Sequence, residues 1–152
     1  MAEKSILFIN GIPNKDGNTA KLAERLLAGK AYDTLHLVDY RLYSYGQKFA
    51  DDQFEEIVAR MKEAESIVIG SPVYWHNMSG AVRNLLDRFY GPVSPGALSG
   101  RKFAFLFQGG APEQWMLEKG EYTMGRFARM YGMEYIGMAT NDIEADKLAK
   151  KL

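Results

Sequence analysis

The sequence of 152 residues contains no cysteine. This excludes disulfides, thiolate nucleophiles, cysteine-bound zinc and iron–sulfur clusters, so any redox chemistry has to come from a bound cofactor. An excess of charge is missing as well, because 19 lysines and arginines balance 19 aspartates and glutamates. The chain therefore lacks the positive field on which binding to nucleic acids or anionic membranes relies. We expect neither kind of partner.

Long hydrophobic runs are also absent. No segment approaches the ~20 apolar residues of a membrane-spanning helix. The apolar stretch before Asn10 and Gly11 is only about four residues long, too short for a signal peptide. We therefore expect a cytoplasmic protein. The length, with 47% hydrophobic and 25% charged residues, predicts one packed domain spanning residues 1–152.

Short apolar runs alternate with segments of helical period. We predict buried strands at residues 6–9, 35–38, 67–69 and 103–107, and a fifth near 135–140. Helices are expected between them, since apolar residues recur at i, i+3, i+4 and i+7. The helix before the third strand should begin with a capping box formed by Asp52 and Glu55. Ser79 is the predicted N-cap of the next helix, and Gly29 the left-handed end of the first. A fourth helix is expected over residues 118–131.

Alternating strands and helices favour a parallel sheet covered by helices on both faces, the doubly wound α/β class. The second and fifth strands carry polar residues, whereas the other three are continuous apolar runs. Fully buried strands have such runs, so the polar strands should lie at the edges. This predicts the strand order 2-1-3-4-5.

In such a sheet the ligand lies beyond the carboxyl ends of the strands, between strands one and three. The loop there covers residues 10–19. Its amides, the Thr19 hydroxyl and the carboxamides of Asn14 and Asn18 are suited to surround a phosphate at the positive end of a helix. It is not a P-loop, because Asn18 and Thr19 stand where lysine and serine or threonine are needed. An ordinary turn capped by Asn18 explains the same residues.

Two further loops reach the same edge. After the third strand, Tyr74 and Trp75 are large aromatics off any periodic core face, where a planar cofactor would cover them. A cover for the sheet end or a subunit contact is the alternative. The adjacent His76 is a candidate to act on a substrate, but a lone loop histidine is more often a hydrogen-bonding or exposed residue, and we do not expect it to be a catalyst. After the fourth strand, Gly109 and Gly110 would let backbone approach a flat ring closely, or would form a plain turn.

These motifs carry a family resemblance over almost the whole chain. Gly11-Ile12-Pro13-Asn14 followed by Gly17-Asn18-Thr19 resembles the phosphate loop of NADPH-dependent FMN reductases, a group of the flavodoxin-like superfamily. Residues 70–75, followed by Ser79-Gly80 and residues 85–88, resemble that group's flavin-ring loop and the helix behind it.

The resemblance implies a flavodoxin-like three-layer sandwich and a bound FMN. The phosphate would be held by Asn14, Asn18 and Thr19, the ring would lie on residues 72–76, and residues 108–110 would border it. The predicted cofactor-binding residues are Gly11, Pro13, Asn14, Asn18, Thr19, Pro72, Val73, Tyr74, Trp75, His76, Gln108, Gly109 and Gly110. A homodimer is implied as well, with NAD(P)H as co-substrate and a small-molecule electron acceptor.

One residue departs from the pattern. The group usually has serine at the position of Ile12 and often an arginine nearby, so weaker FMN binding or a phosphate role for Lys15 follows. No catalytic side chain or metal site is predicted, since the cofactor supplies the chemistry. The expected function is NAD(P)H-dependent reduction, through FMN, of a flavin or quinone. A single-electron carrier or a non-catalytic flavin-binding protein remains an alternative, although carriers use an acidic face that this neutral chain does not indicate.

Residues on two other segments are candidate walls for the substrate. They are Tyr43, Tyr45, Phe49 and residues 91–100. A surface loop or a dimer contact accounts for them equally.

Overall fold

A computed structural model describes residues 5–152, in which five parallel strands form the central sheet in the order β2-β1-β3-β5-β6. The strands are β1 (Ile6–Asn10), β2 (Asp33–His36), β3 (Ser66–Tyr74), β5 (Lys102–Gln108) and β6 (Glu134–Ala139). A short sixth strand, β4 (Asn77–Met78), pairs antiparallel with β3. The predicted order is confirmed for the parallel strands, with the polar strands at the two edges, and β4 is the addition that the sequence did not indicate.

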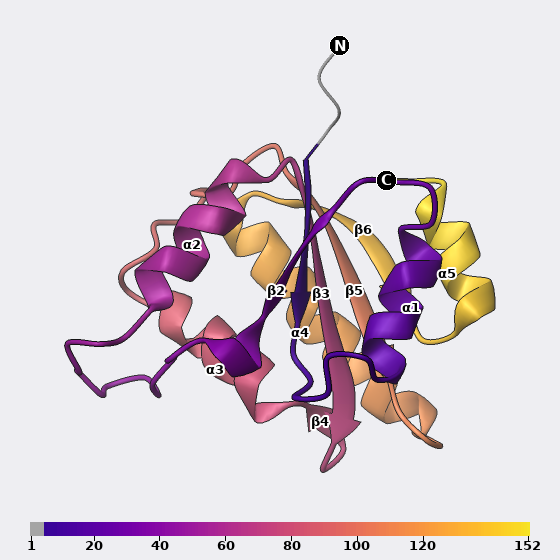
Figure 1. Cartoon of the computed structure of the whole chain (residues 1–152), viewed down its shortest axis with the longest axis horizontal. Coiled ribbons are helices and arrows are strands. Elements are labelled where there is room, and N and C mark those ends of the chain that lie inside the picture. The colour runs from indigo at the N-terminus through magenta and orange to yellow at the C-terminus, as the bar shows by residue number, and fades with distance from the viewer. Residues whose placement is uncertain (1–4) are drawn as a thin grey trace.

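Helices cover both faces of this sheet (Figure 1). On one face lie α1 (Asn18–Leu26) and α5 (Asp142–Ala149), and on the other α2 (Phe54–Glu63), α3 (Gly80–Phe89) and α4 (Gln114–Tyr131). Each face has its own apolar core, because alternate strand residues point to opposite sides. Phe8 and Val68 belong to the α1–α5 core, whereas Ile9 and Ile69 belong to the larger core beneath α2, α3 and α4.

Several element ends differ from the predictions. The strand predicted at residues 35–38 ends at His36, because Leu37–Asp39 turn into a 3₁₀ helix. β3 continues to Tyr74, since its last residues find hydrogen-bonding partners in β4. Helix α4 starts at Gln114, ahead of the predicted residue 118. Its apolar period is interrupted at Gly120, where a Cβ would lie 2.4 Å from the Phe107 ring, so this turn packs by backbone.

One predicted helix end is confirmed, one is displaced and one is wrong. The Ser79 hydroxyl accepts a hydrogen bond from Val82 N at 3.3 Å and caps α3. Helix α1 already ends at Leu26, with Leu27 at its C-cap, so Gly29, with its left-handed φ of +77°, lies in the turn after the helix. The capping box of α2 does not form, because Gln53 occupies the N-cap position. Asp52 Oδ1 still accepts a hydrogen bond from Phe54 N at 2.9 Å, and the same carboxylate pairs with Arg88 on α3 at 2.6 Å. None of the helices within residues 5–152 has the length and apolar character needed to cross a membrane.

Candidate functional site

The loop between β1 and α1 folds around Asn14. Its Oδ1 accepts a hydrogen bond from Asp16 N at 3.1 Å, and its carbonyl accepts one from Gly17 N at 3.3 Å. Asparagine favours such turns because its side chain bonds its own backbone two residues on. The Asn14 Nδ2 group stays available as a donor on the exposed side of the loop, next to the exposed Pro13.

Thr19 lies in the first turn of α1 and is fully buried. Within residues 5–152, its Oγ1 is the one buried side-chain oxygen that lacks a hydrogen-bond partner. A buried hydroxyl without a partner costs free energy, so such an atom indicates a missing ligand. It also lies at the amino end of a helix, where backbone N–H groups and the helix dipole favour an anion.

Lys15 and Asn18, two further polar residues of this loop, are exposed. Asn18 is the first residue of α1, and the cap position belongs to Gly17, so Asn18 is not the cap. Lys15 Nζ pairs with Asp39 Oδ2 at 2.7 Å, and each of the two side chains is about half exposed. Lys15, the predicted substitute for the family's arginine, is therefore held by a carboxylate of the segment after β2.

Buried hydrogen bonds join this loop to the segment after β3. Gly11 N donates to Gly70 O at 2.8 Å, and Ser79 Oγ donates to Gly11 O at 2.7 Å. Ser71 Oγ accepts from Ser79 N at 2.8 Å. A Cβ on Gly11 would lie only 2.1 Å from Val82 Cγ2, so only glycine fits here. The two predicted loops are thus one connected unit at the carboxyl edge.

The second predicted loop is partly a hairpin. Pro72 is buried within β3 and Val73 is half-buried opposite Met78, whereas Tyr74 is exposed opposite Asn77. The turn between the strands consists of Trp75 and His76, with φ values of +48° and +65°. Turns with two positive φ values normally use asparagine and glycine. Large side chains in this conformation are strained, and such strain is concentrated at functional sites.

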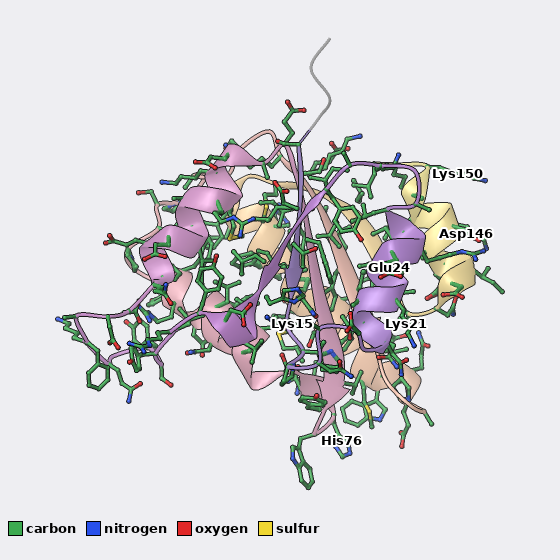
Figure 2. The ribbon with its side chains drawn as sticks, viewed as in Figure 1. Lys15, Lys21, Glu24, His76, Asp146 and Lys150 are labelled. Atoms are coloured by element: carbon green, nitrogen blue, oxygen red, sulfur yellow. The ribbon has the colours of Figure 1, made fainter. Side chains whose placement is uncertain are left out.

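His76 lies at the carboxyl edge of the sheet (Figure 2). Trp75 is 96% exposed, which is unusual for the largest apolar side chain. The His76 ring contacts Trp115 edge-on, with ring centroids 5.9 Å apart. Trp115 Nε1 in turn donates to Glu113 Oε2 at 2.7 Å. The sequence analysis missed Trp115, because the start of α4 was placed after it.

The third predicted loop closes the same edge. Gln108 ends β5 half-buried, and Gly109 follows directly. A Cβ on Gly109 would lie 3.0 Å from Val73 Cβ, which brings the loop against the hairpin. Gly110 is exposed, and a Cβ there would meet nothing within 4 Å. All three predicted loops therefore lie together, with open space above Gly110.

The predicted substrate walls lie on segments of their own. Tyr43 packs against Phe49 with ring centroids 4.5 Å apart, and Tyr45 approaches Tyr90 at 6.1 Å. A cavity of about 810 Å³ lies between residues 47–50, α2 and residues 92–97. Its lining includes Phe49 but none of the predicted cofactor-binding residues. Within residues 5–152, no three His, Cys, Asp or Glu side chains are grouped as metal ligands would be.

Comparisons with known proteins agree with this arrangement. The profile of the family described as "NADPH-dependent FMN reductase" matches residues 5–125. An iron–sulfur flavoprotein of Archaeoglobus fulgidus is 35% identical over 96 residues, which cover 55% of this chain and 47% of that protein. A putative NAD(P)H-dependent FMN-containing oxidoreductase of Bacillus subtilis is 28% identical over 92 residues, covering 55% and 51%. The chain spans about half the length of the curated relatives it matches.

Solved structures show the same fold. The Trp repressor binding protein from Bacillus subtilis superposes with a TM-score of 0.72 at 18% identity, covering 95% of both chains. A flavodoxin, WrbA-like protein from Agrobacterium tumefaciens gives a TM-score of 0.65 at 16% identity, covering 97% of this chain and 92% of the other. The predicted flavodoxin-like architecture is confirmed by these similarities.

Proposed function

The chain belongs to the family of NADPH-dependent FMN reductases, and from that premise we propose that it binds FMN at the carboxyl edge of its sheet and reduces a small acceptor with NAD(P)H. A flavin or a quinone is the proposed acceptor. We further propose that residues 1–152 act as one FMN-binding domain. The archaeal relative is named an iron–sulfur flavoprotein, but this chain has no cysteine and so provides no thiolate to bind an iron–sulfur cluster.

The observation that carries this proposal is the buried, partnerless hydroxyl of Thr19. The phosphate of FMN would supply its missing acceptor. Asn14 Nδ2, the Asn18 carboxamide and the backbone N–H groups at the start of α1 would donate to the remaining phosphate oxygens. Gly11 and Pro13 would shape the backbone around them. The loop thus offers several donors for a dianion, although its one lysine is already paired with Asp39.

The hairpin of β3 and β4 supports a ring site beside the phosphate loop. Tyr74 and Trp75 present exposed aromatic surface that a flat ring would cover. Val73 and Pro72 would position these aromatics from the strand, and His76, held against Trp115, would bound the site on one side. Gln108, Gly109 and the open space at Gly110 would form the opposite border.

When bound, FMN accepts a hydride from a nicotinamide and passes the electrons on to a second substrate. The work of this chain is binding and orientation. The phosphate loop fixes one end of the cofactor, and the linked Gly11–Ser79–Ser71 hydrogen bonds hold that loop in register with the hairpin. With the ring lying on Tyr74 and Trp75, its other face would stay open, so that nicotinamide and acceptor can occupy that face in turn.

We also propose that two copies associate through the face formed by α3 and α4. A groove of about 390 Å³ lies there, lined by apolar side chains that include Leu86, Tyr90, Phe127 and Met130. Tyr90 is 74% exposed, and Met130 is 54% exposed. Arg83, Asp87 and Arg126 line the same groove, so it carries both signs of charge, which a self-complementary twofold interface can pair. A second copy would cover this apolar surface.

The function is tested by adding FMN to the purified chain and following NADPH and NADH oxidation with and without a flavin or quinone acceptor. We expect a yellow complex whose flavin absorbance is bleached by a reduced nicotinamide and restored by the acceptor. A yellow protein that ignores both nicotinamides would contradict the reductase assignment. A chain that does not bind FMN at all would contradict the cofactor site.

A further inference from the structure

Beneath the phosphate loop, Asn10 and His36 form a side-chain pair that the proposed function does not use. Asn10 ends β1 and is fully buried, and His36 ends the neighbouring strand β2 at the register position opposite it. Asn10 Nδ2 lies 3.1 Å from His36 Nδ1. Asn10 Oδ1 accepts a hydrogen bond from Ile12 N at 3.3 Å. The pair therefore connects the edge strand β2 to the Ile12 amide of the loop.

These contacts fix the protonation state that the pair needs. Ile12 N–H is a donor, so the Asn10 oxygen must face it and the Asn10 NH₂ group must face His36. His36 Nδ1 then has to be the acceptor, which requires a neutral imidazole with its proton on Nε2.

Protonation would break this arrangement. With a proton on His36 Nδ1, two donors would face each other. Rotating the Asn10 amide would offer its oxygen to His36 but would turn its NH₂ group toward Ile12 N–H. In either orientation one hydrogen bond is lost, either the one between Asn10 and His36 or the one between Asn10 and Ile12.

We infer that His36 is a positioning residue that holds the phosphate loop through Asn10, so that the loop is ordered for FMN when the imidazole is neutral and loosened when it is protonated. The effect on FMN rests on the proposed function, but the effect on the loop does not. Imidazole is the side chain whose charge ordinarily changes between about pH 5 and pH 8.

Charged groups on the surrounding segments define the controls. Lys15 and Asp16 lie in the loop itself, and Asp39 follows β2 and is paired with Lys15. Figure 2 shows Lys15 near the carboxyl ends of β1 and β2, and Lys21 and Glu24 on α1. Asp33, at the far end of β2, is exposed. Asp39→Asn removes the Lys15–Asp39 ion pair, whose carboxylate lies three residues after His36. It leaves the Asn10–His36 contact in place.

The test compares wild type with His36→Asn, His36→Leu and Asp39→Asn at pH 8 and pH 5.5. His36→Asn places a carboxamide oxygen near the position of Nδ1 and cannot titrate there, whereas His36→Leu removes the acceptor. Two quantities are measured for each protein. One is hydrogen-exchange protection of the Ile12 amide without ligand, and the other is the FMN dissociation constant from quenching of flavin fluorescence.

On acidification, the Ile12 amide should lose protection in wild type and in Asp39→Asn, but not in His36→Asn. The affinity for FMN should fall about fivefold more in the first two proteins than in His36→Asn, which corresponds to one hydrogen bond. His36→Leu should be weaker than wild type at pH 8. Titration of the FMN phosphate is common to all variants and cancels in this comparison. Equal pH profiles in wild type and His36→Asn would overturn the inference. If no variant binds FMN at pH 8, the proposed function fails, while Ile12 protection still decides the inference.

Discussion

At the scale of single residues, the predicted site consists of side chains with quite different surroundings. Thr19 is buried without a partner, Pro72 is buried within a strand, and Trp75 is almost fully exposed. The residue types and their order along the chain predicted where these side chains would gather. Burial could not be predicted, since it depends on which neighbours each strand finds. The contact of Trp115 with His76 likewise joins segments far apart in the sequence.

Thr19→Ala should weaken FMN binding by about 1 kcal/mol, because the phosphate would lose one hydroxyl donor. Thr19→Ser keeps that hydroxyl and should bind nearly as wild type. Titration calorimetry with FMN and with riboflavin measures both effects. Riboflavin lacks the phosphate, so its affinity should not change. An equal loss for the two ligands would mean that Thr19 acts through packing.

Gly11→Ala should lower the free energy of unfolding by about 3 kcal/mol, since an added methyl group overpacks a tight core. Its Cβ would lie 2.1 Å from Val82 Cγ2 and 2.8 Å from Gly70 O. Gly110→Ala is the matched control, because a Cβ there meets nothing within 4 Å. Urea denaturation should show little change for Gly110→Ala. Equal stability of the two variants would contradict the packing described around Gly11.

At the scale of elements, periodicity located the strands and helices well, whereas most errors lie at their ends. β3 was predicted too short because its end is stabilised by β4, a tertiary pairing that no local pattern reveals. The capping box failed for a similar reason. Asp52 has a stronger partner in Arg88, which arrives from α3 and lies 4.9 Å above the Phe54 ring. Asp52 thus shares its two oxygens between Arg88 and the first amide of α2, that of Phe54.

The Asp52–Arg88 pair predicts acid sensitivity of the segment before α2. Hydrogen bonding to Arg88 lowers the pKa of Asp52 from its usual value to about 2. Because the folded pKa lies below the unfolded one, this stabilisation is complete above about pH 4 and is lost as the pH falls through 2. Its size is roughly 2 kcal/mol.

Asp52→Asn should therefore cost about 3 kcal/mol at pH 7, because Arg88 loses its partner in a largely buried place. It should also flatten the fall in stability between pH 4 and pH 2. The control is Asp51→Asn, which removes an exposed pair with Arg41 and should change stability much less. Denaturant titrations over pH 2–7 provide the comparison. An acid slope that survives in Asp52→Asn would exclude this pair as its cause.

At the scale of the whole molecule, the two faces of the sheet differ in what they leave exposed. The face of α3 and α4 carries the groove with Tyr90 and Met130, whereas α5 on the opposite face has Ile143, which is 70% exposed. The doubly wound order was predictable because the two polar strands indicated the edges of the sheet, and right-handed crossovers place helices on both faces. The groove was not, since it arises from how α3 and α4 lie side by side.

Met130→Arg should convert the proposed dimer to a monomer, because a charge would be buried at the apolar interface. Light scattering coupled to size-exclusion chromatography measures the mass directly. Ile143→Arg introduces the same charge on the other face and should leave the mass unchanged. Wild-type protein that elutes as a monomer at micromolar concentration would refute the association.

The turn that carries Trp75 has a spectroscopic consequence. The sequence contains only two tryptophans, and the other, Trp115, contacts the neighbouring His76. Both indoles therefore lie at one end of the molecule, and the tryptophan emission of this chain originates there. A ligand settling on that end should alter the emission strongly, while local fraying of α5 near the C-terminus should leave the signal unchanged.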